Sequence, residues 1–111
     1  MKPVTPFQRK VYDRLREVPR GRVTTYRLLA EAGGCRSPRA VGQALKNNPF
    51  APEVPCHRVI QSDLNIGGFF GCRAGSEVRR KLKMLRGEGV EFVGGRLKDE
   101  SLLFAFDDKG V

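Results

Sequence analysis

The stretch TTYRLLAEAGGCRSPRAVGQALKN, residues 24–47, decides the fold of this chain. It predicts a short helix over residues 26–32, a turn of glycines, and a further helix that begins at Ser37 and Pro38 and ends near Asn47. Two short helices joined by a tight glycine turn are typical of a helix-turn-helix. The small side chains of the later helix allow close packing, either on a neighbouring helix or on another surface.

The segment before this stretch predicts one more helix. Thr5 can cap it, Pro6 suits its first position, and Gln8 completes a capping box. Apolar residues then recur at helical spacing, and Pro19 and Gly21 are expected to end the helix.

The segment after it predicts a last helix and a hairpin. Ser76 is expected to cap the helix, and Val78, Leu82 and Leu85 are expected to face inward. We expect the basic side chains of this helix to remain in water, namely Arg79, Arg80, Lys81, Lys83 and Arg86. Residues 90–98, with a pair of glycines inside them, predict a small β-hairpin.

Length and charge set the class of protein. A chain of 111 residues that is 40% apolar predicts a single folded domain over residues 1–111. The net charge is +9, and it is unevenly placed, because residues 1–50 carry eleven Lys and Arg against three acidic side chains. This asymmetry favours a surface for a polyanion such as DNA or RNA. A solvated basic surface without a partner is the alternative.

The apolar and cysteine patterns exclude several classes. No apolar run approaches the ~20 residues that span a bilayer, and the first residues lack the apolar segment of a signal peptide. The three cysteines are an odd number without C-x-x-C spacing, which favours neither a disulfide framework nor a metal site. We therefore expect an intracellular protein, cytoplasmic and nucleoid-associated or nuclear, with at least one free thiol and no membrane partner.

Cys56 precedes His57, the single histidine of the chain. A free thiol titrates near pH ~8.5, so a nucleophilic cysteine needs a base, positive charge or a helix N-terminus beside it. By residue type, His57 is such a base and Arg58 carries such a positive charge. A buried, inert thiol is the alternative, because neighbours in sequence can point apart.

The residues Pro55-Cys56-His57-Arg58-Val59 resemble the active-site signature of the O6-alkylguanine-DNA alkyltransferases, also called methylated-DNA–protein-cysteine methyltransferases. Further motifs resemble this family in the same order: Gly21-x-Val23-x-Thr25-Tyr26, Arg39-Ala40-Val41-Gly42-x-Ala44, Asn48-Pro49, Gly67-Gly68-Phe69 and Glu88-Gly89. The resemblance covers residues 7 to about 92 and implies the catalytic C-terminal domain of the family. The implied fold is a small, mainly helical α/β domain with a winged helix-turn-helix and short β-strands.

The resemblance implies DNA repair by direct damage reversal, without a cofactor or metal. Cys56 would accept an alkyl group from O6 of guanine once, as a suicide enzyme. His57 would take the thiol proton through a water, and Glu88 would orient His57. Asn48 would support the turn that holds the site, and Tyr26 would hydrogen-bond the guanine and help neutralise the leaving base.

The resemblance also implies base flipping out of double-stranded DNA that contains O6-alkylguanine, by a monomer. Arg39 would fill the hole left in the base stack, and small residues would let its helix enter the minor groove. The expected DNA-binding residues are Tyr26, Arg27, Arg39, Ala40, Gly42, Gln43 and Ala44. The expected pocket for the base consists of Pro55, Val59, Phe69, Phe70 and Gly71, with the carbonyls of Cys56 and Val59 reading the guanine amine.

Two other functions are compatible with parts of the sequence. Alkyltransferase-like proteins resemble the same domain and bind the lesion without repairing it, recruiting excision repair instead. Their acceptor cysteine is typically replaced, so Cys56 favours transfer. A plain helix-turn-helix regulator would explain the basic half but not Cys56 and His57 with Glu88.

Three features depart from the family pattern. The full-length enzymes commonly carry an additional N-terminal domain, whereas this chain begins directly at the resemblance. Phe69 and Phe70 give a more apolar lid than usual. The stretch over residues 71–81 is several residues longer, which would reposition the last helix and with it Glu88.

Overall fold

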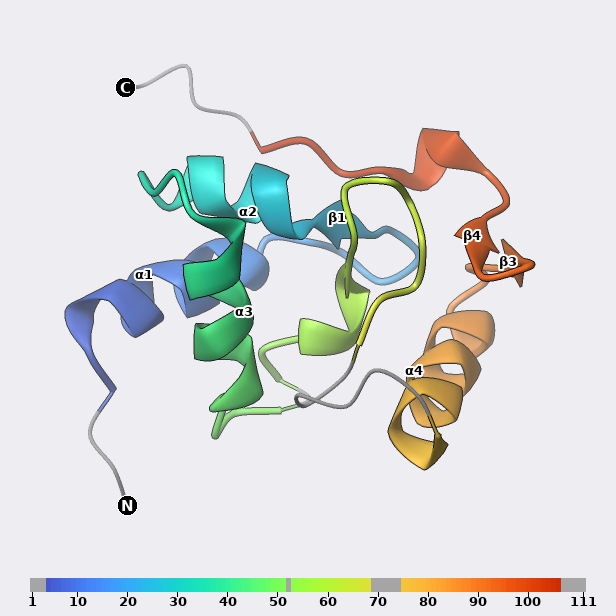
Figure 1. The fold of residues 1–111 in the computed structure, drawn as a ribbon, viewed down its shortest axis with the longest axis horizontal. Helices are drawn as coiled ribbons and strands as arrows, with labels where there is room; N and C mark the ends of the chain where they lie inside the picture. The colour runs from blue at the N-terminus through green and yellow to red at the C-terminus, as the bar shows by residue number, and fades with distance from the viewer. Residues whose placement is uncertain (1–3, 52, 69–74, 107–111) are drawn as a thin grey trace.

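The computed structural model describes residues 4–51, 53–68 and 75–106. Along the chain, the elements are α1 (Pro6–Leu15), β1 (Thr24–Thr25), α2 (Tyr26–Ala32), α3 (Pro38–Lys46), the 3-10 helix η1 (Cys56–Arg58), β2 (Val59–Ile60), α4 (Ser76–Gly87), β3 (Phe92–Val93), β4 (Arg96–Leu97) and the 3-10 helix η2 (Glu100–Leu102). The expected small, mainly helical α/β domain with short strands is confirmed (Figure 1).

The first helix starts as predicted and ends early. Thr5 accepts a hydrogen bond from the backbone of Gln8, whose side chain accepts one from Thr5 in return, which completes the capping box. The helix ends at Leu15 rather than at Pro19, because Glu17 and Val18 turn to donate to carbonyls three residues back.

The helix-turn-helix has the predicted bounds. The hydroxyl of Thr25 accepts a hydrogen bond from Leu28 N at the start of α2, and that of Ser37 accepts one from Ala40 N at the start of α3. The turn between them uses Gly34 at a φ of +73°, a conformation that costs glycine no strain. Helices α2 and α3 pack against each other.

The fourth helix differs from its prediction at two positions. Gly75, at a φ of +87°, precedes the helix and supplies no side-chain cap, and Ser76 is the first helical residue. The prediction of a Ser76 cap was therefore wrong. Lys81 was predicted to be in water but is 0% exposed.

The strands form two separate pairs. The predicted hairpin is confirmed as β3 and β4, which pair antiparallel with Phe92 opposite Leu97. The other pair, β1 with β2, is parallel and places Thr24 opposite Val59. It was not predicted, because strands of two residues carry no readable periodicity.

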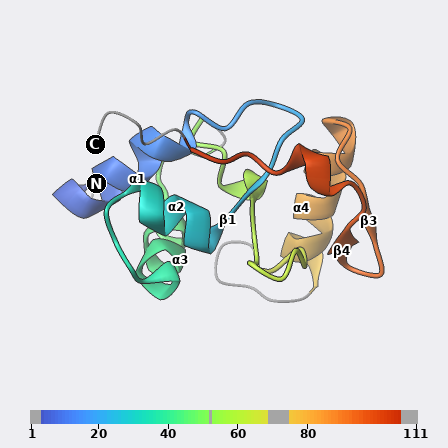
Figure 2. The same ribbon diagram turned by 90° about the horizontal axis from the view of Figure 1, so that it is seen from above.

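The core consists of two clusters on either side of the parallel pair. One cluster lies among α1, α2 and α3 and includes Cys56 and Val59, while the other includes Ile60, Leu85 and Leu97. Both views place α1–α3 on one side of β1 and α4 with the hairpin on the other (Figures 1 and 2). The parallel pair therefore joins the two halves of the molecule.

The segment after the hairpin returns across the junction. Val23 N donates to Leu102 O at 3.0 Å, and Phe104 N donates to Val23 O at 2.6 Å. Figure 2 shows this segment running back over the elements of the first half. Among the described residues, no helix is long and apolar enough to cross a membrane.

Candidate active site

Cys56 opens the short helix η1 at the junction of the two halves. Its side chain is in the first core cluster and the residue is 6% exposed. Its backbone N–H donates to Val54 O at 2.8 Å, and the buried Pro55 precedes it. Cys56 is a free cysteine.

The buried surroundings of Cys56 determine the pKa of its thiol. Burial raises the pKa of Cys56, while a hydrogen bond with the Asn48 side chain and the positive charge of Lys81 oppose that rise. The thiol is therefore protonated at neutral pH and needs a base to become a nucleophile. Asn48 also joins the preceding turn, since its Nδ2 donates to Val54 O at 3.0 Å and its Oδ1 accepts from Phe50 N at 2.9 Å.

His57 and Glu88 meet across 31 residues of sequence. His57 Nε2 lies 2.8 Å from Glu88 Oε2. Burial alone would raise the pKa of Glu88, but hydrogen bonds from Arg58 and His57 lower it to about 2, so the carboxylate is ionised. Burial lowers the pKa of His57, which keeps the imidazole neutral. Because an ionised carboxylate only accepts, Nε2 carries the hydrogen and Nδ1 keeps its lone pair.

Arg58 has a different role from the one predicted. Its Nε and Nη2 donate to the two oxygens of Glu88 at 2.9 and 3.0 Å, and its Nη1 donates to Val18 O at 3.0 Å. The guanidinium is thus committed to the carboxylate in a bidentate pair, and Lys81 supplies the positive charge near the thiol. Glu88 was expected to be repositioned by the long stretch over residues 71–81, but it contacts His57.

Lys81 is the functional candidate that sequence reasoning missed. Its Nζ donates to three backbone carbonyls, Val59 O at 2.7 Å, Ile66 O at 2.7 Å and Gly68 O at 2.9 Å. Burial lowers the pKa of this amine to about 7, and the charge of a Cys56 thiolate opposes that lowering. Three acceptors match the three hydrogens of the ammonium form. Lys81 thereby ties α4 to β2 and to the segment after it.

A sequence signal for Lys81 did exist. Residues 78, 81, 82 and 85 have the i, i+3, i+4, i+7 spacing of one helix face, and the other three are apolar. A lysine within an apolar face is either extended to the surface or buried with partners. The sequence cannot distinguish these, because the carbonyls that bind Lys81 come from other segments.

Tyr26 and Arg27 begin α2, on the first half of the molecule. Burial raises the pKa of Tyr26, and a Cys56 thiolate would raise it further. Arg27 is exposed, with Nε 3.5 Å from a carboxylate oxygen of Glu31.

The predicted DNA-binding residues of α3 divide between two faces. Arg39 and Gln43 are exposed, and Ala40 and Gly42 are half-buried. A Cβ at Gly42 would meet nothing within 4 Å, so no close packing within the described chain requires a glycine there. Ala44 is only 3% exposed and packs in the first core cluster, so its side chain faces away from any partner of α3.

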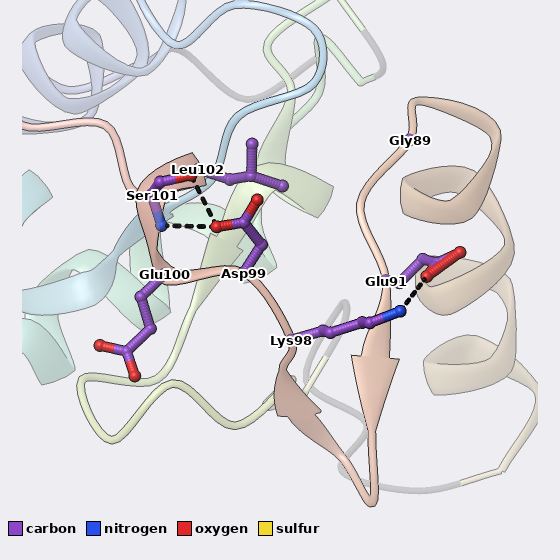
Figure 3. Close-up of a pocket in the computed structure, with 7 residues that line it drawn as sticks. All are labelled: Gly89, Glu91, Lys98, Asp99, Glu100, Ser101 and Leu102. Atoms are coloured by element: carbon purple, nitrogen blue, oxygen red, sulfur yellow. Dashed lines mark hydrogen bonds and ion pairs between the residues drawn. The ribbon is translucent and has the colours of Figure 1, made fainter.

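The predicted base pocket is described only in part. Val59 O accepts a hydrogen bond from Lys81 Nζ at 2.7 Å. Phe69, Phe70 and Gly71 lie outside the described residues. A surface pocket elsewhere, lined by residues that flank the hairpin and by residues of η2, contains none of the predicted site residues (Figure 3). No three His, Cys, Asp or Glu side chains gather as a metal site within residues 4–51, 53–68 and 75–106.

Comparison with known proteins places this geometry in a family. The family model described as "6-O-methylguanine DNA methyltransferase, DNA binding domain" matches residues 6–90. A methylated-DNA–protein-cysteine methyltransferase of Methanothermobacter thermautotrophicus is 45% identical over 91 residues, 81% of this chain and 48% of that protein. A DNA base-flipping protein of Thermus thermophilus is 44% identical over 87 residues, 78% of this chain and 55% of that protein.

A solved structure resembles nearly the whole chain. The crystal structure of S. pombe Atl1 in complex with damaged DNA containing O6-carboxymethylguanine superposes with a TM-score of 0.78 at 32% identity, covering 96% of this chain and 100% of Atl1. By contrast, the chain spans about half the length of the two curated relatives. The match over residues 6–90 shows that the chain belongs to the O6-methylguanine DNA methyltransferase family, with the DNA-binding domain of that family as the matched part.

Proposed function

We propose that this chain repairs DNA by transferring an alkyl group from O6 of guanine to Cys56. The observation that carries the proposal is the neutral imidazole of His57, the residue that follows Cys56 in the chain, with its Nε2–H held by the ionised Glu88 at 2.8 Å. Such a pair is a general base whose free Nδ1 can accept the thiol proton, here through a water. The matched DNA-binding domain would then also be the catalytic C-terminal domain.

The proposed step is a displacement at carbon. His57 Nδ1 takes the thiol proton, and the Cys56 sulfur attacks the alkyl carbon. A carbon–sulfur bond forms as the carbon–O6 bond breaks, and the bonding pair leaves on the guanine. A proton returns to the guanine ring, whose charge the Tyr26 hydroxyl helps to neutralise. The thioether product is stable, so each chain acts once.

The DNA partner follows from the position of the target atom. An alkyl group on a base edge is inaccessible inside a duplex, so the nucleotide must be extruded, at a cost of a few kcal/mol. The exposed Arg39 and Gln43 on α3 can contact the base stack and the backbone of the DNA. The open surface at Gly42 allows the DNA to approach the helix closely. The Atl1 complex with damaged DNA supports the same partner here.

An alkyltransferase-like protein that binds the lesion and recruits excision repair is the second candidate. The structural likeness to Atl1, with a TM-score of 0.78 over 96% of this chain, favours it. The presence of Cys56, followed in the chain by a histidine whose imidazole is held by Glu88, favours transfer.

One measurement distinguishes the two candidates. We expect incubation with a duplex containing O6-methylguanine to add one methyl group to the intact mass, mapped to Cys56. Cys56→Ala should bind the lesion without any gain in mass, while Cys35→Ala, a matched control at the other described free cysteine, should gain the methyl group. Unmodified wild-type protein in a tight lesion complex would support the second candidate and contradict transfer.

A further inference from the structure

The outward face of α4 is rich in basic side chains. Successive residues of a helix lie about 100° apart, so its exposed basic side chains fall within an arc of about 120°. They are Arg79, Arg80, Lys83 and Arg86. The opposite face carries the buried Lys81 and Leu85.

These charges are largely without partners. Among the described residues, no hydrogen bond or ion pair joins Arg79, Lys83 or Arg86 to another side chain, and Arg80 has one contact of 4.0 Å with Glu77. Like charges at i, i+4 on a helix destabilise it by a few tenths of a kcal/mol per pair. An anionic partner would offset that repulsion.

The acidic side chains that follow α4 are occupied elsewhere. Glu91 lies 3.3 Å from Lys98, and Glu100 lies 3.3 Å from Arg96. Figure 3 shows the contact of Glu91 with Lys98 beside the hairpin. The surplus charge of α4 is therefore not neutralised by these carboxylates.

We propose that this face of α4 is a second phosphate-binding surface, which holds the DNA backbone on the far side of Cys56 from α3. In both views, α3 and α4 lie on opposite sides of the η1–β2 segment that carries Cys56 (Figures 1 and 2). The longest extent of the protein is 35 Å, which about ten base pairs of B-DNA would span at 3.4 Å each. A duplex of about this length is therefore long enough to reach from α3 to α4. The inference rests on the proposed function for the identity of the partner.

A matched pair of double variants tests this surface. Arg79→Gln with Lys83→Gln removes two charges from α4, and Arg96→Gln with Lys98→Gln removes the same two residue types from the hairpin. Binding of a labelled, undamaged duplex is measured by fluorescence anisotropy over a range of salt. Each phosphate contact contributes about 0.9 to the slope of log K against log salt, so we expect the α4 variant to lose roughly 1.8 from that slope. The hairpin variant should keep the wild-type slope.

A second readout separates this surface from the chemistry. Free O6-methylguanine base carries no phosphate, so the α4 variant should accept its methyl group at the wild-type rate, measured by intact mass. A wild type that transfers nothing but shows the slope difference would refute the proposed function and support the surface. An unchanged slope, an equal fall in both variants, or no duplex binding by the wild type would overturn the surface. The surface would also be overturned if the α4 variant kept the wild-type slope but lost a self-association that the wild type shows. In that case, α4 would bind an acidic surface of a second copy of the chain.

Discussion

The two halves of the molecule are held together by different interactions. The half formed by α1, α2 and α3 packs around buried apolar residues. Its helices begin after the capping residues Thr5, Thr25 and Ser37, which can be recognised from the local sequence. The half formed by α4 and the hairpin reaches the candidate site through buried polar side chains, Lys81 and Glu88. The first half therefore depends on apolar packing, whereas the second half depends on buried polar contacts at the candidate site.

This difference predicts different sensitivities to substitution. A buried polar group that loses its partners is expensive, whereas exposed side chains contribute little to stability. We expect substitutions of the buried polar side chains Lys81 and Glu88 in the second half to reduce stability and the reaction together. Substitutions on the exposed face of α3 should affect DNA alone.

The largest effect is expected at Lys81. Lys81→Met keeps the apolar stem but leaves three carbonyls without their donor, and each unpaired buried group costs about 1–3 kcal/mol. We expect the free energy of unfolding in urea to fall by roughly 3–5 kcal/mol. Lys83→Met on the exposed face of the same helix is the control, with a change within about 0.5 kcal/mol. Equal stability of the two variants would show that the three hydrogen bonds do not hold the halves together.

The next effect concerns pH and Glu88. Its pKa is lowered to about 2 in the folded protein, so its stabilisation is complete above the unfolded value and disappears as pH falls from about 4.5 towards 2. We expect the free energy of unfolding of the wild type to drop over this window by up to about 3 kcal/mol more than that of Glu88→Gln.

Urea titrations at several pH values measure this difference. Glu91→Gln, which removes an exposed carboxylate of the same half, is the control and should retain the wild-type pH dependence. Parallel curves for the wild type and Glu88→Gln would contradict an ionised Glu88 held by Arg58 and His57.

The smallest effect is expected at Arg39, in the other half. Arg39→Ala removes an exposed side chain, so stability should stay within about 0.5 kcal/mol of wild type. Affinity for a duplex with O6-methylguanine should fall about tenfold, or roughly 1.4 kcal/mol, because no side chain then fills the hole that the flipped nucleotide leaves in the base stack. Transfer from the free base should be unchanged, as measured by intact mass. A slower reaction with the free base would place Arg39 in the chemistry and weaken the contrast between the halves.

The sequence by itself determined the elements whose signals are local. Capping residues, glycine turns and helical spacing give α1, α2, α3, α4 and the hairpin. The errors in their bounds are the early end of α1 at Leu15 and the cap of α4, which is Gly75 rather than Ser76. The same local reading singled out Cys56 and His57 as neighbours. These features depend on interactions within a few residues, which the order of residues records directly.

Only the tertiary structure decided how distant groups meet. It paired β1 with β2, turned Arg58 from the thiol to Glu88, and buried Lys81 against carbonyls from two other segments. Ala44, expected at a DNA surface, faces the core for the same reason. Such contacts join residues far apart in the chain, and whether a charged side chain ends in water or in the core depends on the partners that folding brings to it.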